Sequence, residues 1–158
     1  MLQQRTATIA AIFSEVLANL AFMFTEEDLP PSPEGDPWME TTIGYRGPAC
    51  GSLSFLCTRG FARVLAANLL AIDPEDRDAD AKAPDAAKEF MNIVCGQLVT
   101  TLHGPEQVFD ISIPRNRPLN EGPDLMLSPG PESCTLSVEG FPVQLTFLPG
   151  VEPDGRRG

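Results

Sequence analysis

Two pairs of alternating apolar and polar segments, each joined by a tight turn, place the strongest constraint on how this chain can fold. The first pair spans residues 38–45 and 49–57, and the second spans 134–138 and 143–148, with Gly-Pro and Glu-Gly at the turns. Strands joined in this way pair antiparallel, so the chain is expected to build an antiparallel or mixed sheet. Such a sheet buries a face against helices. We therefore expect an α+β fold.

Three segments carry apolar side chains at helical spacing: residues 6–24, 59–72 and 85–102. The charged residues 73–84 are expected to form a loop, because an Asp-Pro pair ends the second helix and a Pro-Asp pair starts the third. A helix precedes strands twice along the chain. This order indicates pseudo-duplicated halves, each built from a helix followed by two strands.

The remaining segments read as strands and connections. Residues 108–113 alternate and are predicted to form a strand closed by Pro114, and a Pro/Gly-rich connection then runs to Pro131. Within it, residues 124–127 are a candidate short strand. The acidic, proline-rich residues 26–37 are predicted to form an exposed loop. We expect a single domain over residues 1–150 and a disordered tail over 151–158.

The balance of charge excludes several classes of partner. The chain has 158 residues, with 11 Lys and Arg against 22 Asp and Glu, and a formal net charge of −11. Nucleic acids and anionic membrane surfaces attract a basic footprint, so neither is an expected partner.

There is no run of 18 apolar residues, and Ser14, Glu15 and Asn19 interrupt the apolar N-terminal stretch. We read that stretch as an amphipathic helix and expect a cytoplasmic protein.

The residues that carry most enzyme chemistry are sparse. The four cysteines have no CxxC spacing, and His103 is the single histidine. Buried, reduced thiols are therefore a better interpretation than a metal site, and no metal ligand is predicted. The sequence also contains no GxSxG, GxxxxGK[ST] or GxGxxG motif. The cysteines are Cys50, Cys57, Cys95 and Cys134.

The third helix has two distinct faces. At about 100° per residue, Asp85, Glu89, Asn92, Gly96 and His103 fall close to one line and are expected to face solvent. The opposite side carries apolar residues that are expected to pack on the sheet. These apolar residues are Ala87, Phe90, Met91, Val94 and Leu98.

The polar line has an unusual composition for a plain solvated face. Asn92 and Gly96 lie in the middle of the helix, and glycine there costs about 1 kcal/mol relative to alanine. A partner could approach the bare backbone at Gly96 closely. The alternative is that Gly96 admits a neighbouring helix and Asn92 is an ordinary surface residue. His103 is interpreted as a helix-end histidine that favours the C-terminal dipole.

The run from Asp85 to Asn92 has the form D-x-x-x-E-x-x-N and continues as NIVCGQLVTTL and then FDISIP. Over residues 85–114 it resembles the CheC/CheX/FliY family of chemotaxis phosphatases, and most closely CheX-like domains. The resemblance implies a CheX-like fold and removal of the phosphoryl group from a phospho-aspartate on a response regulator such as CheY. It also suggests a homodimer, with the proline-rich connection 114–131 as a possible exchanged arm.

The resemblance also implies a role for each residue of the motif. Glu89 would pair with the active-site lysine of the regulator, and Asn92 would orient a water in line with phosphorus. Mg²⁺ would belong to the regulator, and the chain would need no cofactor of its own. Asp85 and Gly96 are the expected partner-binding residues, although Asp85 at a helix start could instead serve the helix dipole.

Some members of this family carry two such sites, but the first helix here departs from the pattern. Glu15 and Asn19 are four residues apart and lack the preceding acid, so we predict one site. The alternative function is a non-catalytic adaptor of the same fold that binds a receiver domain or forms part of a motility or signalling assembly.

Overall fold

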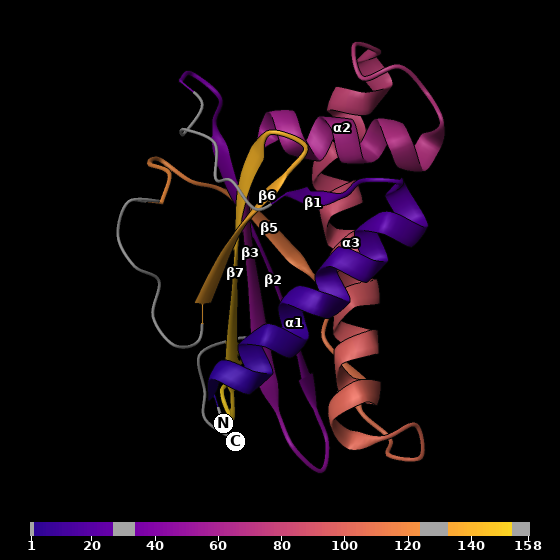
Figure 1. Cartoon of the computed structure of the whole chain (residues 1–158), viewed down its shortest axis with the longest axis vertical. Helices are drawn as coiled ribbons and strands as arrows, with labels where there is room; N and C mark the ends of the chain where they lie inside the picture. Colours follow the sequence, from indigo (N-terminus) through magenta and orange to yellow (C-terminus); the bar gives the residue numbers. More distant parts are fainter. Residues whose placement is uncertain (1, 27–33, 124–132, 153–158) are drawn as a thin grey trace.

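A computed structural model describes residues 2–26, 34–123 and 133–152, with side chains from residue 8 onward. Its architecture is α+β, with three α-helices packed on an antiparallel sheet (Figure 1). The helices lie on the same side of the sheet, so the molecule has two layers. The expected fold class is therefore confirmed.

The helices follow the predicted apolar periodicity, but their ends differ from the prediction. The first helix changes to a π-helical segment for its last turn, and the third begins eight residues earlier than its predicted start at Asp85. Left-handed residues end the first two helices, Phe22 at φ 54° and Ala71 at φ 56°. The elements are α1 (Leu2–Val16), η1 (Leu17–Ala21), α2 (Arg59–Leu70) and α3 (Arg77–His103).

The sheet has seven strands, and all its pairs among the described residues are antiparallel. The order is β1-β6-β7-β3-β2-β4, and β5 also pairs with β2. Both predicted hairpins, β2-β3 and β6-β7, are present. The strands are β1 (Thr25–Glu26), β2 (Trp38–Arg46), β3 (Gly51–Thr58), β4 (Asp110–Ile111), β5 (Arg115–Pro118), β6 (Ser133–Val138) and β7 (Phe141–Pro149).

Two strands lie where loops were predicted. Thr25 and Glu26 pair with the end of β6, and residues 115–118 of the expected connection pair with β2. The Arg-Asn-Arg-Pro sequence of β5 has no apolar alternation, so no local pattern indicates a strand. Its pairing depends on the free edge of β2. The candidate strand at 124–127 lies outside the described residues, as does the tail beyond residue 152.

Four phenylalanines from four elements join the two layers. Phe13 of α1 lies 5.3 Å from Phe55 of β3 and 5.2 Å from Phe90 of α3, measured between ring centroids. Phe61 of α2 lies 5.9 Å from Phe55. All four side chains are fully buried. This cluster holds the three helices over the centre of the sheet and so orients the outer face of α3.

The early start of α3 corrects the predicted loop at 73–84. Asp76 caps the helix, with its side chain accepting a hydrogen bond from the backbone N–H of Asp78 at 2.9 Å. Pro84 lies inside the helix and has no N–H to give to the carbonyl of Asp80, four residues earlier. A guanidinium N–H of Arg59 donates to that carbonyl instead, at 3.0 Å. The helix therefore passes through Pro84 with its broken hydrogen bond replaced.

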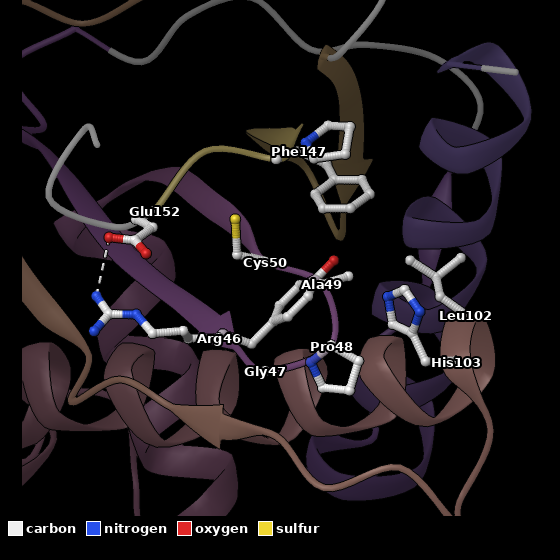
Figure 2. Close-up of a pocket in the computed structure, with 12 residues that line it drawn as sticks. Arg46, Gly47, Pro48, Ala49, Cys50, Leu102, His103, Phe147 and Glu152 are labelled. Atoms are coloured by element: carbon white, nitrogen blue, oxygen red, sulfur yellow. Dashed lines mark hydrogen bonds and ion pairs between the residues drawn. The ribbon is translucent and has the colours of Figure 1, made fainter. Parts of the chain in front are cut away.

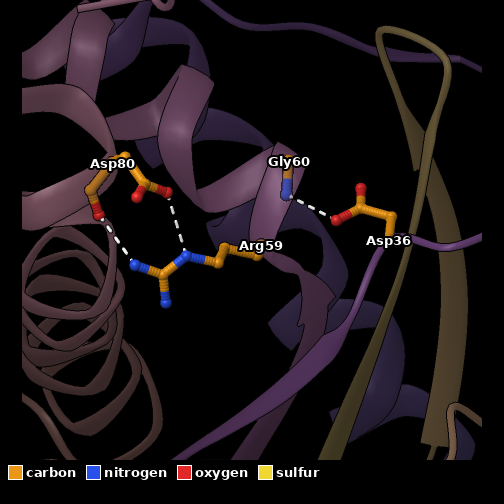
Figure 3. Close-up of polar contacts among 4 residues, drawn as sticks. All are labelled: Asp36, Arg59, Gly60 and Asp80. Carbon is orange, nitrogen blue, oxygen red and sulfur yellow. Dashed lines mark hydrogen bonds and ion pairs between the residues drawn. The ribbon is translucent and has the colours of Figure 1, made fainter. Parts of the chain in front are cut away.

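Arg59 also pairs with the side chain of the same residue. Its Nε lies 2.9 Å from Oδ1 of Asp80, so one guanidinium contacts both the carboxylate and the carbonyl (Figure 3). On the other side of the α2 start, Asp36 accepts a hydrogen bond from the N–H of Gly60 at 3.0 Å. A Cβ on Gly60 would displace that carboxylate, so the glycine leaves room for the Asp36 side chain. These contacts set the position of α2 against α3.

The described residues include no helix that is both long and apolar enough to cross a membrane.

The four cysteines are free, with Cys57 and Cys95 buried. Burial raises the pKa of Cys95 to about 12 and that of Cys134 to about 11, so both thiols are protonated at neutral pH.

The replacement of the Pro84 hydrogen bond by Arg59 can be tested with a double-mutant cycle. Arg59→Gln is expected to lower the free energy of unfolding, because the carbonyl of Asp80 loses its donor. Pro84→Ala restores the helical N–H and is expected to raise it by about 1 to 3 kcal/mol. In the Pro84→Ala background, Arg59→Gln should cost less. Urea unfolding measures all four proteins, with the exposed Arg77→Gln as control. An equal cost in both backgrounds would refute the coupling.

The ion pair gives a separate prediction on pH. Hydrogen bonding and charge from Arg59 hold the pKa of Asp80 below the ordinary value for an aspartate. The pair therefore stabilises the fold at neutral pH, and this contribution is lost as pH falls through the pKa of the folded state. Carboxyl-carbon NMR titration should find a depressed pKa for Asp80 that rises in Arg59→Gln. An unchanged pKa in that variant would mean that another group causes the shift.

Candidate functional site

The polar line on α3 forms an exposed surface, here called the α3 ridge and defined as Asp85, Glu89, Asn92 and Gly96. The first three residues are exposed and Gly96 is half-buried. The opposite stripe of α3 is fully buried in the core, as predicted. The ridge is therefore a part of this helix that a partner can reach. The buried stripe comprises Ala87, Phe90, Met91, Val94 and Leu98.

Asp85 lies two turns inside α3, so its expected place at the helix start is wrong. The capping role belongs to Asp76. Asp85 instead lies 3.9 Å from the ammonium of Lys88, with its side chain 70% exposed. This pair contributes little stability because water screens it. Since neither capping nor a strong ion pair accounts for Asp85, its carboxylate remains free to meet a partner.

The N-terminal end of the ridge borders the C-terminal end of α2. A small hollow of about 70 Å³ between the two helices is lined by Asp85 and Glu89 from α3 and by Leu69 and Leu70 from α2. Leu70 is 49% exposed. The carboxylate of Glu89 thus lies at the rim of an apolar surface, where an opposite charge from a partner would be partly shielded from water.

Gly96 leaves the C-terminal end of the ridge without a side chain. A Cβ built there would meet one atom within 4 Å, Cδ1 of Ile111 at 3.9 Å, which is ordinary contact. The glycine is therefore not needed to admit a neighbouring helix, and that alternative is wrong. Its backbone is also helical, so no positive φ requires it. The absence of a side chain has no internal structural reason and favours close approach from outside.

His103 does not share the exposure of the ridge. It is half-buried, with its ring 5.9 Å from Tyr45 and 5.0 Å from Phe109 between centroids. The loop after α3 brings Phe109 over the last helical turn. The interpretation of His103 as a helix-end residue in the last turn agrees with this position, but its expected exposed position on the polar line is wrong.

A cavity lies beside the C-terminal end of α3. It encloses about 470 Å³ and is lined by the β2-β3 turn, the end of α3 and the end of β7 (Figure 2). Its charged groups, Arg46 and Glu152, pair with each other at 3.0 Å. No ridge residue lines it. The cavity and the ridge are therefore separate features of the molecule.

Other candidate residues are not gathered into a site. Glu15 on α1 and Asn19 in the π-helical segment are both exposed. Within the described ranges, no group of three or more His, Cys, Asp or Glu is arranged to hold a metal ion. The ridge thus presents a carboxylate and an amide at i and i+3, which can form hydrogen bonds to a partner and to water.

Comparison with known families identifies the relatives of this chain. The family model "Chemotaxis phosphatase CheX" matches residues 39–118, about half of the sequence. The chain belongs to the CheX family. The matched range runs from the start of β2 to the end of β5 and contains the whole ridge. No curated protein matches the sequence.

Solved structures of CheX proteins share the fold. A chemotaxis protein CheX from Desulfovibrio desulfuricans has 17% identity and a TM-score of 0.66, with 92% of this chain and 99% of that chain covered. CheX in a complex with CheY, BeF₃ and Mg²⁺ from Borrelia burgdorferi has 21% identity and a TM-score of 0.61, with 89% and 94% covered. FliY from Thermotoga maritima has 14% identity and a TM-score of 0.51, with 90% and 89% covered.

Sequence patterns did not reveal the neighbours of the ridge. A strand is predicted over residues 108–113, but only Asp110 and Ile111 form one. Val108 is 82% exposed and Ile113 is 85% exposed. Pro114, directly after Ile113, was the available signal, since proline interrupts a strand ladder.

The bare position in the ridge gives a stability prediction. Gly96→Ala is expected to raise the free energy of unfolding by about 1 kcal/mol, because alanine is the better helix former and the added Cβ meets no clash. Thermal or urea unfolding measures it. Gly104→Ala is the matched control and should destabilise, because Gly104 has φ 85°. A destabilised Gly96→Ala protein would mean that internal packing requires the glycine.

Proposed function

We propose that this protein removes the phosphoryl group from the phospho-aspartate of a CheY-like response regulator. Glu89 pairs with the active-site lysine of the regulator and anchors the complex. Asn92 orients a water molecule in line with the phosphorus atom. Asp85 and Gly96 complete the surface on which the regulator rests.

One observation carries this proposal. Glu89 and Asn92 are both exposed on the outer face of α3, one turn apart, beside a glycine that packing does not require. Glu89 and Asn92 remain hydrated in this position. Asn92 and Gly96, however, lower the stability of the helix that carries them. A partner that inserts its active site against this face would account for residues that the fold itself does not need.

The proposed reaction requires few catalytic groups from this protein. The oxygen of the water attacks phosphorus, the bond between phosphorus and the aspartate oxygen breaks, and the products are inorganic phosphate and a free carboxylate. In phosphoryl transfer, positioning and charge stabilisation account for most of the catalysis. The amide of Asn92 can accept a hydrogen bond from the water and donate one to a phosphoryl oxygen. No nucleophile from this chain is required.

The metal ion belongs to the regulator in this proposal. The complex from Borrelia burgdorferi contains Mg²⁺ and BeF₃ together with CheX and CheY. Mg²⁺ neutralises charge on the transferred phosphoryl group. In this proposal the chain needs no cofactor of its own.

Two further expectations stay predictions. The chain is expected in the cytoplasm, where response regulators act. A homodimer is also expected, but the first part of the anticipated arm, residues 115–118, pairs with β2 of its own chain. The outer edge of β6 is a better candidate for strand pairing, because β1 covers only Ser137 and Val138 in the described structure.

The proposal predicts different kinetic defects at the two central residues. Asn92→Ala is expected to lower kcat by at least about 100-fold, because the attacking water loses its orientation. Glu89→Ala is expected mainly to raise KM, since it removes the anchor for the lysine. The measurement is loss of phosphoryl label from a CheY-like receiver with Mg²⁺, with and without this protein.

Gln97→Ala is the matched control, since Gln97 is exposed on the same helix but lies off the ridge. Full turnover by Asn92→Ala would refute its catalytic role. Binding of the receiver without any acceleration by the wild-type protein would instead support the adaptor function.

A further inference from the structure

A β-bulge lies beside the α3 ridge, at the edge of the sheet. The backbone N–H of Ser112 donates to the carbonyl of Gly44 at 2.8 Å, and the N–H of Gly44 donates to the hydroxyl of Ser112 at 2.9 Å. Two residues earlier on β2, Thr42 is opposite Arg115. Ile113 and Pro114 together therefore face one residue of β2, Ile43. Such an insertion re-aims a side chain out of the sheet.

The bulge turns Ile113 into solvent. Ile113 is 85% exposed, a larger exposed fraction than that of any other large hydrophobic residue that the structure describes. Pro114 cannot donate a ladder hydrogen bond, so the pairing with β2 is interrupted at this point. A β-branched apolar side chain gains nothing for the fold in this position, because it leaves its surface in water.

The bulge adjoins the bare part of the ridge. Ile111 precedes it by two residues, is 38% exposed, and has its Cδ1 3.9 Å from the position of a Cβ on Gly96. Ile111 thus lies next to Gly96, and Ile113 follows it two residues later on the same edge segment. Exposed apolar residues bordered by polar ones are typical of protein interaction sites.

We propose that Ile113, supported by Ile111, is a docking residue for the receiver domain and takes an apolar side chain of that domain beside its phosphorylation site. The inference rests on the proposed function, because a receiver that presents its phospho-aspartate to Asn92 must cover Gly96 and so reaches Ile111. The phosphorylation site is polar and competes with water for its contacts. An adjacent apolar contact supplies affinity and excludes water from the rim.

This role predicts an effect on binding and none on the chemical step. Ile113→Ser is expected to raise KM for the phosphorylated receiver by about 5- to 30-fold, the loss expected from one exposed isoleucine that becomes buried. The value of kcat should stay within about twofold, because Ile113 does not touch the reacting atoms. Asn92→Ala has the opposite signature.

Val108→Ser is the matched control. Val108 is 82% exposed, β-branched and on the same segment, but it lies against Gly47 at the β2-β3 turn, away from the ridge. It should keep the KM of the wild type. Unfolding curves of both serine variants are expected to match the wild type, since neither side chain is buried. The same three proteins are also titrated with a CheY-like receiver loaded with beryllofluoride and Mg²⁺.

The outcomes separate the two proposals. Weaker binding by Ile113→Ser alone supports the role of Ile113 as a docking residue. If the wild type binds the loaded receiver but does not accelerate hydrolysis, the phosphatase proposal fails. Weaker binding by Ile113→Ser would support the docking role in that case as well. Equal KM and equal binding for all three proteins, with an active wild type, would overturn the docking role and leave the function intact. A loss of the same size in Val108→Ser would overturn it too.

Discussion

The guanidinium of Arg59 supports the helix that carries the candidate site. Pro84 removes one hydrogen bond from α3 and leaves the carbonyl of Asp80 without its helical donor. Arg59 donates to that carbonyl at 3.0 Å and to the carboxylate of the same residue at 2.9 Å. The helix can therefore start at Arg77 and bring two extra turns against α2. Without this contact we expect the helix to begin at Pro84, because proline is favoured in a first helical turn. The contacts of α2 with the first two turns of α3 would then be lost.

The same helix serves two purposes that its faces keep apart. One face is wholly apolar and fixed in the core by Phe90, which contacts the rings of Phe13 and Phe55. The other face carries residues that lower helix stability, among them Asn92 and Gly96. Burial of the first face compensates for the poor helix formers on the second. A rigid support of this kind suits a surface that must present a carboxylate and an amide in a set geometry to another protein.

Much of the fold was predictable because its signals are local. Apolar periodicity identified all three helices and both hairpins, and antiparallel pairing followed from short turns. The ridge was predictable for the same reason, since positions three and four apart share a helix face. The errors occurred where a distant partner decides the structure. Residues 77–84 form helix with Arg59 donating to the carbonyl that Pro84 leaves without a helical donor, and residues 115–118 pair with the free edge of β2.

The sequence by itself determined the layers of this protein and the line of Asp85, Glu89 and Asn92, because periodicity depends only on neighbours along the chain. Tertiary structure decided what surrounds that line. It removed Asp85 from the helix start, covered His103 with aromatic rings, and turned Ile113 outward at a bulge opposite Ile43. These features depend on hydrogen bonds and packing between segments far apart in the chain, and no local pattern carries that information.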